Sequence, residues 1–302
     1  MNTCKKMILE QLTTPYRRLF ASVSFSALEE IRFRTERPIM LYGGGKVRYL
    51  SALGGETEDI SQAKTIGRAD IGALASTLCQ HSVYAHLDDI KDGFVTLRGG
   101  HRAGLAGRAV LRDGQAAGLT NIAGINLRIA HAYRGCAEAV APRLLHNGRV
   151  QNTLLIGPPA CGKTTLLRDL ARIFSADFKL CIVDERSEIA GSYEGVPQFD
   201  VGLQTDVLDR FPKSVGMMLS IRSLSPEIVI TDELGGEADI MALHHVSSCG
   251  ARLIASIHGD NIESIRQTHP ALCNLFDIAI LLGREQNRPA ILAVKELHAD
   301  DC

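Results

Sequence analysis

A glycine-rich segment near the middle of the chain constrains its fold more than any other stretch. Residues 157–164 read G-P-P-A-C-G-K-T, which is the spacing of a phosphate-binding P-loop. An apolar run at 153–156 precedes the loop, and apolar residues recur at helical spacing from 165 to 174. Strand, glycine loop and helix in this order predict a nucleotide-phosphate site, because the N–H groups of the loop and the positive end of the helix then face the same anion.

Two side chains of the P-loop have predicted roles of their own. Lys163 is expected to reach the β- and γ-phosphates, and the Thr164 hydroxyl is expected to ligate Mg²⁺. The remaining contacts to the phosphates are expected from the loop itself and the first turn of the helix, namely Gly157, Pro158, Pro159, Ala160, Cys161, Gly162 and Thr165.

Composition excludes several classes of protein. The net charge is −1, so nothing in it indicates a nucleic-acid partner, and the 45% apolar content is ample for a packed core. The eight cysteines form no C-x-x-C pair and no cluster at zinc spacing, which favours reduced thiols in a cytoplasmic protein. The start of the chain lacks the pattern of a signal peptide, and no apolar run approaches the length of a membrane span, so we expect a soluble protein.

The first half of the chain predicts a small α+β domain. We expect a helix over residues 1–24, broken near Pro15, followed by an antiparallel meander over 31–50. A polar loop over 54–64 and a helix over 70–81 come next, and then short strands between 94 and 129 joined by glycine turns. A further helix is expected over 134–146, ended by Asn147-Gly148. We place the boundary so that the N-terminal domain covers 1–130 and the second domain covers 131–302.

Arginines recur along the strands between 94 and 129. Each of them fits a solvated strand face, and each also fits contact with a phosphate, because the planar guanidinium matches phosphate oxygens. The phosphate could belong to the nucleotide of the same chain or to that of a neighbouring subunit. The arginines are Arg98, Arg102, Arg108, Arg112 and Arg128.

Polar residues follow three apolar runs in the second half. Asp184 and Glu185 follow 179–183, Asp232 and Glu233 follow 228–230, and His258 follows 252–257. Ligands bind at the carboxyl ends of the strands in parallel α/β sheets, so we expect these side chains near the P-loop. The second pair has the Walker B pattern. Asp232, with Asp184 and Thr164, is expected around Mg²⁺, and Glu233 is expected to act as the base for an attacking water.

The second half as a whole alternates strand and helix signals. Its strand runs are apolar enough for a sheet buried on both faces, which favours a mostly parallel sheet flanked by helices. We therefore predict an α/β fold with a RecA-like P-loop ATPase core and a smaller α+β N-terminal domain.

The order of these motifs resembles that of the type II/IV secretion ATPases. In that class the stretches are called Walker A, Asp box, Walker B and His box. By position, Asp184 and Glu185 fall in the Asp box, Arg222 is the arginine ahead of Walker B, and His258 is the His-box histidine. The resemblance implies catalytic roles for Lys163, Glu185, Arg222, Glu233 and His258.

Longer strings resemble one family within that class, stage III sporulation protein AA of endospore-forming bacteria. They include G-P-P-A-C-G-K-T-T-L-L-R-D-L at 157–170, V-D-E-R-S-E-I-A-G at 183–191 and I-R-S-L-S-P at 221–226. G-H-R-A-G-L-A-G-R at 100–108 extends the resemblance to the N-terminal half, so that it covers nearly the whole chain. Gln204 departs from the pattern, which has arginine there, and this weakens any role of that loop in sensing phosphate.

The resemblance implies a function that composition does not. It implies an ATPase of the mother-cell cytoplasm that requires ATP and Mg²⁺ and forms a homo-hexamer. Membrane-embedded sporulation channel proteins, joining mother cell and forespore, are the implied partners at the cytoplasmic face. In such hexamers arginines of the N-terminal domain reach a γ-phosphate, and Arg102, Arg108 and Arg128 are the candidates here.

Two other functions remain open on the sequence. RecA-like cores also drive nucleic-acid motors, although the near-neutral charge and the lack of an aromatic-basic stripe count against this one. A nucleotide-gated scaffold with little hydrolysis is the other, and the presence of Lys163, Thr164, Asp232 and Glu233 argues against it.

Overall fold

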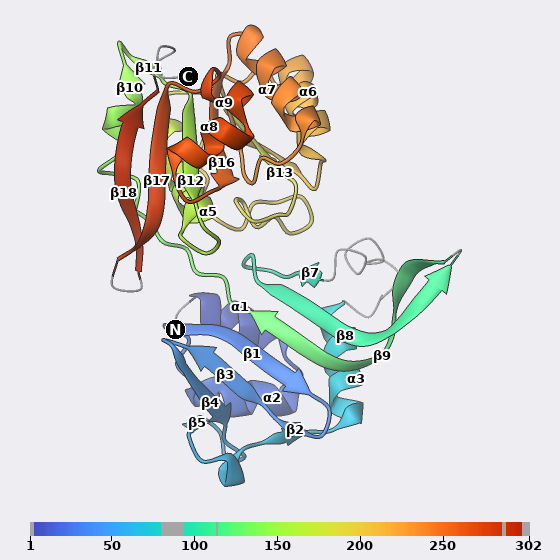
Figure 1. Ribbon diagram of the computed structural model, residues 1–302. Coiled ribbons are helices and arrows are strands. Elements are labelled where there is room, and N and C mark those ends of the chain that lie inside the picture. Colours follow the sequence, from blue (N-terminus) through green and yellow to red (C-terminus); the bar gives the residue numbers. More distant parts are fainter. Residues whose placement is uncertain (1–2, 80–93, 113, 286–287, 298–302) are drawn as a thin grey trace. The chain divides into compact units, whose positions relative to one another are not determined.

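The chain forms two compact units, Met1–His131 and Ala132–Cys302 (Figure 1). The structure is a computed structural model, and it describes residues 3–79, 94–112, 114–285 and 288–297. No helix in these ranges is both long enough and apolar enough to cross a membrane.

A seven-stranded antiparallel sheet forms the centre of the N-terminal unit. Its strand order is β5-β4-β3-β1-β9-β8-β7, and the expected meander is its β1-β3-β4 part. The strands of this sheet are β1 (Leu28–Arg34), β3 (Met40–Gly43), β4 (Lys46–Leu50), β5 (Glu56–Thr57), β7 (Phe94–Thr96), β8 (Arg102–Arg112) and β9 (Gln115–Arg128). The unit also contains α1 (Thr3–Gln11), α2 (Thr14–Leu19), α3 (Arg68–Leu78) and the short pair β2 (Arg37–Pro38) and β6 (Thr65–Ile66).

Aromatic side chains fill the core of this unit. Tyr16 and Phe20 from the N-terminal helical segment pack against Phe33 of β1, with ring centroids 6.4 and 6.2 Å apart. All three rings are fully buried, and the Tyr16 hydroxyl donates a hydrogen bond of 2.7 Å to Asp70 of α3. The helix break expected near Pro15 lies between the end of α1 at Gln11 and the start of α2 at Thr14, because proline fits the first turn of α2.

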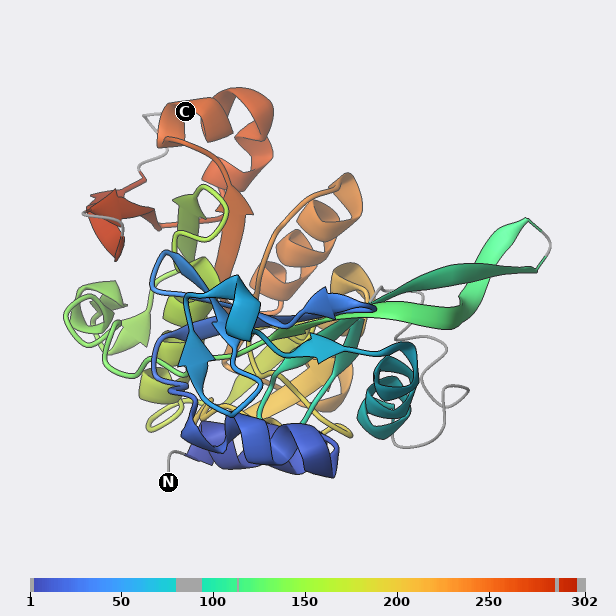
Figure 2. The same ribbon diagram turned by 90° about the horizontal axis from the view of Figure 1, so that it is seen from below.

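The hairpin formed by β8 and β9 is much longer than the other strands of its sheet. It appears in Figure 2 as a twisted ribbon that runs past the rest of the N-terminal unit. Exposed apolar side chains, Val110 and Leu111, lie near its far end.

The C-terminal unit is built on a seven-stranded sheet of order β14-β13-β15-β16-β12-β17-β18. All neighbouring pairs are parallel except β17–β18, which confirms the predicted mostly parallel sheet. Its strands are β12 (Thr153–Gly157), β13 (Leu180–Asp184), β14 (Thr205–Asp209), β15 (Ile228–Thr231), β16 (Arg252–His258), β17 (Ile278–Glu285) and β18 (Arg288–Glu296). The helices are α5 (Lys163–Phe174), α6 (Lys213–Ser223), α7 (Glu237–Ser248), α8 (Ile262–Thr268) and α9 (Pro270–Cys273).

Successive residues of the central strands serve two separate cores. Leu155 and Ile182 pack with the apolar residues of α5, whereas Leu154 and Cys181 pack with those of α6, α7 and α8. Side chains of a strand alternate between the two faces, so helices on both sides require a continuous apolar run. This is why the strands of this unit show no alternating pattern in the sequence.

Two sequence predictions of secondary structure are wrong. The polar loop expected over 54–64 contains β5 (Glu56–Thr57) and a short 3-10 helix (Ile60–Gln62). The expected helix over 134–146 is a series of turns, followed by a short 3-10 helix (Ala141–Leu144) and the strands β10 (Leu145–His146) and β11 (Arg149–Val150). Asn147 and Gly148 both have positive φ, at 51° and 73°. Such a pair suits a two-residue hairpin turn, and Asn147-Gly148 joins β10 to β11 in this way and does not end a helix.

The helix expected over 70–81 begins at Arg68 and ends at Leu78, with Cys79 as its C-cap, and residues 80 and 81 lie outside the described ranges.

Candidate functional site

The candidate site lies where the parallel strands of the C-terminal unit end. Gly157, the last residue of β12, is in register with His258, the last residue of β16. Beside β16, β15 ends at Thr231, immediately before Asp232 and Glu233. Parallel strands end on the same edge of a sheet, so residues about a hundred positions apart in sequence meet at the P-loop.

The backbone of the P-loop has the shape that an anion requires. Ala160 and Gly162 have left-handed φ angles of 57° and 96°, which turn successive peptide groups inward. Within the described part of the chain, no hydrogen-bond acceptor takes the N–H groups of Ala160, Cys161 or Gly162. Gly157 has no room for a side chain, because a Cβ there would lie 2.6 Å from the Cys161 sulfur. N–H groups that lack an acceptor among the described residues, in a crowded loop, fit phosphate oxygens.

Lys163 is folded back onto the loop in this conformation. Its Nζ donates hydrogen bonds to the carbonyls of Gly157 and Pro158, at 2.7 and 2.9 Å. The side chain is buried, and this burial lowers the pKa of the Lys163 ammonium, while nearby Glu233 and Asp232 act in the opposite direction. The lysine is therefore held by neutral carbonyls, beside carboxylates that attract it.

A chain of polar contacts links Lys163 to Glu233. Lys163 Nζ lies 3.2 Å from His258 Nδ1, and His258 Nε2 lies 3.1 Å from Glu233 Oε1. A protonated lysine has no acceptor, so Nδ1 accepts from it and the neutral imidazole donates from Nε2–H to the carboxylate. The second carboxylate oxygen of Glu233 accepts a bond of 2.6 Å from Arg186. Glu233 itself has a left-handed φ of 47°, a conformation that costs energy and is common at functional sites.

Asp232 is the best candidate for a cation ligand. Its carboxyl is 1% exposed, and among the described residues its Oδ2 has no hydrogen-bond partner. Burial raises the pKa of Asp232 to about 7, and the neighbouring carboxylates Asp184 and Glu188 add to this. A buried carboxylate oxygen without a partner fits Mg²⁺, which prefers oxygen ligands and whose charge would repay the burial. Half-buried Thr164, at the start of α5, is the second candidate ligand.

Asp184 does not share this arrangement, although we predicted it as a metal ligand. It is fully buried, and its two carboxylate oxygens accept backbone N–H bonds from Glu188 and Ala190, both at 2.8 Å. Its oxygens are therefore used to shape the loop that follows β13. The adjacent Glu185, predicted as catalytic, forms an ion pair with buried Lys213 at the start of α6.

The structure does not bring Arg222 to this site. Arg222 lies in the last turn of α6 and is exposed, and β15 begins six residues later. The residues that precede a parallel strand lie at the opposite edge of the sheet from the P-loop, so Arg222 cannot contact a nucleotide bound to its own chain. Gln204 lies at that edge as well, where its amide donates to the carbonyls of Ser175 and Ala176 at the end of α5.

The three arginines predicted to reach a γ-phosphate, of the same chain or of a neighbouring subunit, lie in the N-terminal unit. The guanidinium of Arg102 stacks on the ring of Phe94 at 4.4 Å, and the exposed Arg128 lies 3.9 Å from Glu30. Arg108 is exposed on β8.

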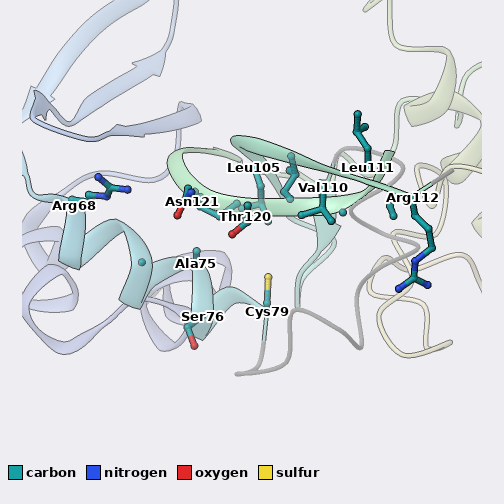
Figure 3. A pocket seen from close by; sticks show the side chains of 15 residues that line it. Arg68, Ala75, Ser76, Cys79, Leu105, Val110, Leu111, Arg112, Thr120 and Asn121 are labelled. Atoms are coloured by element: carbon teal, nitrogen blue, oxygen red, sulfur yellow. The ribbon is translucent and has the colours of Figure 1, made fainter. Parts of the chain in front are cut away.

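A groove of about 820 Å³ lies between α3 and the β8–β9 hairpin (Figure 3). Arg68 and Arg112 line it together with apolar side chains such as Leu105 and Val110. Arg112 is one of the arginines that fit contact with a phosphate, whereas none of the residues predicted at the P-loop, Walker B or His box lines this groove.

Sequence reasoning assigned no role to three residues that the structure places in or beside the site. Arg186 reaches Glu233, Lys213 reaches Glu185, and Arg168 contacts the loop after β13. The only available signal was that Arg186 and Arg168 fall inside the strings that resemble the sporulation family. Which way a side chain turns from a loop or helix depends on its neighbours in space, so spacing alone could not show these contacts.

Comparison with known proteins gives the family. The model of the family described as sporulation stage III, protein AA, matches residues 2–298. The chain belongs to this family. A stage III sporulation protein AA of Bacillus subtilis (strain 168) is 43% identical over 256 residues, which cover 83% of this chain and 79% of that protein.

Two solved structures with a similar fold are an ATPase and a pilus retraction motor. The ATPase DotB of Legionella pneumophila superposes with a TM-score of 0.58 at 14% identity, covering 90% of this chain and 78% of DotB. The pilus retraction motor PilT, solved with bound ADP, gives 0.57 at 14% identity and covers 85% of this chain and 74% of PilT. The likeness confirms the predicted fold class, a RecA-like ATPase core with a smaller N-terminal domain.

Proposed function

We propose that this member of the sporulation stage III, protein AA family is a Mg²⁺-dependent ATPase that works as a homo-hexameric motor. One observation carries the proposal. Asp232 Oδ2, which has no hydrogen-bond partner among the described residues, lies beside a P-loop whose lysine is linked through His258 to Glu233. A cation ligand, a phosphate-binding lysine and a base for water therefore share the same edge of the sheet.

Nucleotide binding changes the partners of Lys163. In the present conformation its ammonium is held by two neutral carbonyl oxygens. Phosphate oxygens are stronger acceptors because they are charged, so Lys163 turns to the β- and γ-phosphates when a nucleotide enters the loop. Thr164 and Asp232 would hold Mg²⁺, which would supply positive charge against the charge that develops on the transferred phosphoryl group.

Glu233 is the proposed base, and it is restrained in this conformation. Both of its carboxylate oxygens are engaged, one by His258 and one by Arg186. A base must be within hydrogen-bond reach of the water whose proton it takes, so one of these oxygens must be released for hydrolysis. Movement of Lys163 away from His258 provides a direct route, because the same imidazole contacts both residues.

The proposed motor is an oligomer in which one subunit completes the site of another. The P-loop edge contains the cations Lys163, Arg186 and Lys213, of which Lys213 is paired with Glu185, and the predicted Arg222 lies at the other edge of the sheet. Phosphoryl transfer is commonly accelerated by an arginine supplied from outside the P-loop core. We propose Arg102, Arg108 and Arg128 of the N-terminal unit for this role.

The test is steady-state ATP hydrolysis measured against protein concentration. We expect activity that requires Mg²⁺ and rises more than proportionally with concentration. Lys163→Ala should lose activity and nucleotide binding, whereas Glu233→Gln should still bind ATP and hydrolyse it about 100-fold more slowly. Glu263→Gln is the matched control, because Glu263 is an exposed glutamate on α8 of the same unit.

Other outcomes would favour the other candidate functions. A flat activity per subunit would exclude a site shared between subunits. Slow turnover that Glu233→Gln leaves unchanged would favour a nucleotide-gated scaffold. Turnover stimulated by DNA, with a steep dependence on salt, would favour a nucleic-acid motor.

We further propose that the protein acts in the mother-cell cytoplasm, against membrane-embedded channel proteins of the sporulation apparatus. Membership of the sporulation family and the likeness to a pilus motor and to DotB support this location. A fluorescent fusion of this chain should gather at the engulfing membrane of sporulating cells. A signal that stays diffuse in the mother cell throughout engulfment would contradict the proposal.

A further inference from the structure

The loop that follows β13 is buried although it has no regular secondary structure. Ser187, Ile189 and Ala190 are each at most 2% exposed. Ser187 also has a left-handed φ of 51°. A buried loop must satisfy its backbone polar groups through contacts outside helices and sheets, so specific side chains have to hold it.

Two side chains of opposite charge hold the same few peptide groups of this loop. From the end of β13, Asp184 accepts the N–H groups of Glu188 and Ala190, both at 2.8 Å. From α5, Arg168 donates to the carbonyls of Glu188 and Ile189, at 2.7 and 2.6 Å. These contacts of Asp184 and Arg168 with residues 188–190, which we call the clamp, join the loop to both the sheet and the P-loop helix.

The side chain of Arg168 is buried where it contacts this loop. It is 8% exposed, and its guanidinium lies 3.8 Å from the ring centroid of Phe199, which lies farther along the same connection. Burial lowers the pKa of Arg168 to about 10, and the negative charge of Asp184 acts in the opposite direction. Burying a guanidinium is costly, so its place is fixed by the bonds that repay the cost.

The clamp connects the phosphate site to the proposed base. Arg168 lies five residues after Lys163 on the same helix, and the clamped loop contains Arg186, which donates to Glu233. We propose that Arg168 is a positioning residue that ties this loop to the P-loop helix and so holds Arg186 on Glu233. Binding of phosphate at the start of α5 is then mechanically coupled to the orientation of the carboxylate that activates water.

The inference rests on the proposed ATPase function, and its first test separates binding from turnover. Arg168→Met should lower kcat about 30-fold, because small displacements of catalytic groups can cost up to about 100-fold. The Kd for a fluorescent ATP analogue should change less than about threefold. Arg168→Lys should recover part of kcat, since lysine keeps the charge but cannot reach both carbonyls with a planar fork. Equal losses in kcat and in nucleotide affinity would show a purely structural role and overturn the inference.

Two further variants serve as controls. Arg172→Met makes the same change one turn later on α5, where the arginine pairs with Asp169 and with Glu138 and forms no hydrogen bond to the loop within the described ranges. It should leave kcat unchanged. Phe199→Leu removes the ring beneath Arg168 but keeps the two carbonyl bonds, so it should cost less than about threefold in kcat. A loss from Arg172→Met as large as that from Arg168→Met would contradict the specific role of the clamp.

A double substitution tests whether Arg168 acts through Arg186. If it does, Arg168→Met combined with Arg186→Gln should be no slower than the slower single variant. Independent effects would instead multiply, and multiplied losses would overturn the proposed route.

Hydrogen exchange tests the clamp without reference to activity. In the nucleotide-free protein, Arg168→Met should speed exchange of the Glu188 and Ala190 amides about tenfold, and leave the amides of β15 and β16 unchanged. If those two amides stay protected, the clamp does not depend on Arg168. If they are released but neither wild type nor variant hydrolyses ATP, the clamp stands and the proposed function fails, so the two failures are distinguishable.

Discussion

When Mg²⁺ is absent, replacing Asp232 by asparagine should raise the free energy of unfolding, by an amount that increases with pH. The carboxyl is 1% exposed, and burial raises its pKa from the ordinary 3.8 to about 7. The folded protein therefore keeps a proton on Asp232 at pH values where the unfolded chain has lost it. As pH rises between these two pKa values the folded state becomes less stable, since the unfolded chain then binds fewer protons.

The size of this loss of stability follows from the difference between the Asp232 pKa in the folded and unfolded states. The difference is about three pH units, and each unit corresponds to about 1.4 kcal/mol, so the ionised carboxylate destabilises the folded wild type by about 4 kcal/mol above pH 7. Asparagine has no charge to bury, although its amide leaves one polar group unpaired at a cost of about 1–3 kcal/mol. That cost does not vary with pH. The stability of Asp232→Asn relative to wild type should therefore rise by about 2–3 kcal/mol between pH 5 and pH 8.

Urea unfolding followed by circular dichroism, in the presence of EDTA at pH 5 and pH 8, measures this difference. Asp177→Asn is the matched control, because Asp177 lies on an exposed turn after α5 and should show no such trend. Added Mg²⁺ and ATP should reverse the order, stabilising wild type but not Asp232→Asn. A difference in stability that is the same at both pH values would refute the reasoning that burial disfavours the charged carboxylate.

Three further predictions concern other parts of the chain. Burial lowers the pKa of His101 to about 4, so the free energy of unfolding of the wild type should fall by about 3 kcal/mol between pH 6.5 and pH 4 through this group. In urea unfolding measured over this pH range, His101→Gln should reduce the dependence of stability on pH, and an unchanged dependence would contradict the prediction. Gly202→Ala should lower the free energy of unfolding by more than about 2 kcal/mol, because the added Cβ would lie 1.6 Å from Ser175 Oγ at a φ of 93°. Gly250→Ala, with a φ of 89° and open space around it, should lower it by only about 1 kcal/mol. Thermal unfolding measures both, and equal losses would exclude the clash. His258→Gln should keep nucleotide binding and lower kcat about 10-fold or more, and an unchanged kcat would remove the histidine from the proposed mechanism.

The sequence was sufficient for the fold class because its strongest signals are local. A glycine loop between an apolar run and a helical pattern specifies strand, turn and helix within about twenty residues, and the structure shows β12, the loop and α5 there. The buried strands that end at Asp184, Thr231 and His258 were also visible, since a sheet covered on both faces needs continuous apolar runs. The prediction of a helix over 134–146 is wrong because Asn-Gly fits both the end of a helix and a hairpin turn, and only the pairing of β10 with β11 decides between them.

Contacts between distant segments were decided only by the tertiary structure. The sequence placed Asp184 and Asp232 after buried strands alike, yet one carboxylate is used up by backbone N–H groups and the other has an oxygen without a partner in the described chain. Arg222 precedes Walker B in sequence and lies at the far edge of the sheet, because a strand carries the chain from one edge to the other.

The sequence by itself determined that this chain has a P-loop, a Walker B strand and a RecA-like core, because these depend on residue type and spacing over short stretches. Only the tertiary structure decided that Lys163, His258, Glu233 and Arg186 form one chain of contacts and that Arg168 clamps the loop beside it. The physical reason is the parallel sheet, which brings the ends of four separate strands to one edge, where burial and hydrogen-bond geometry decide which side chains meet.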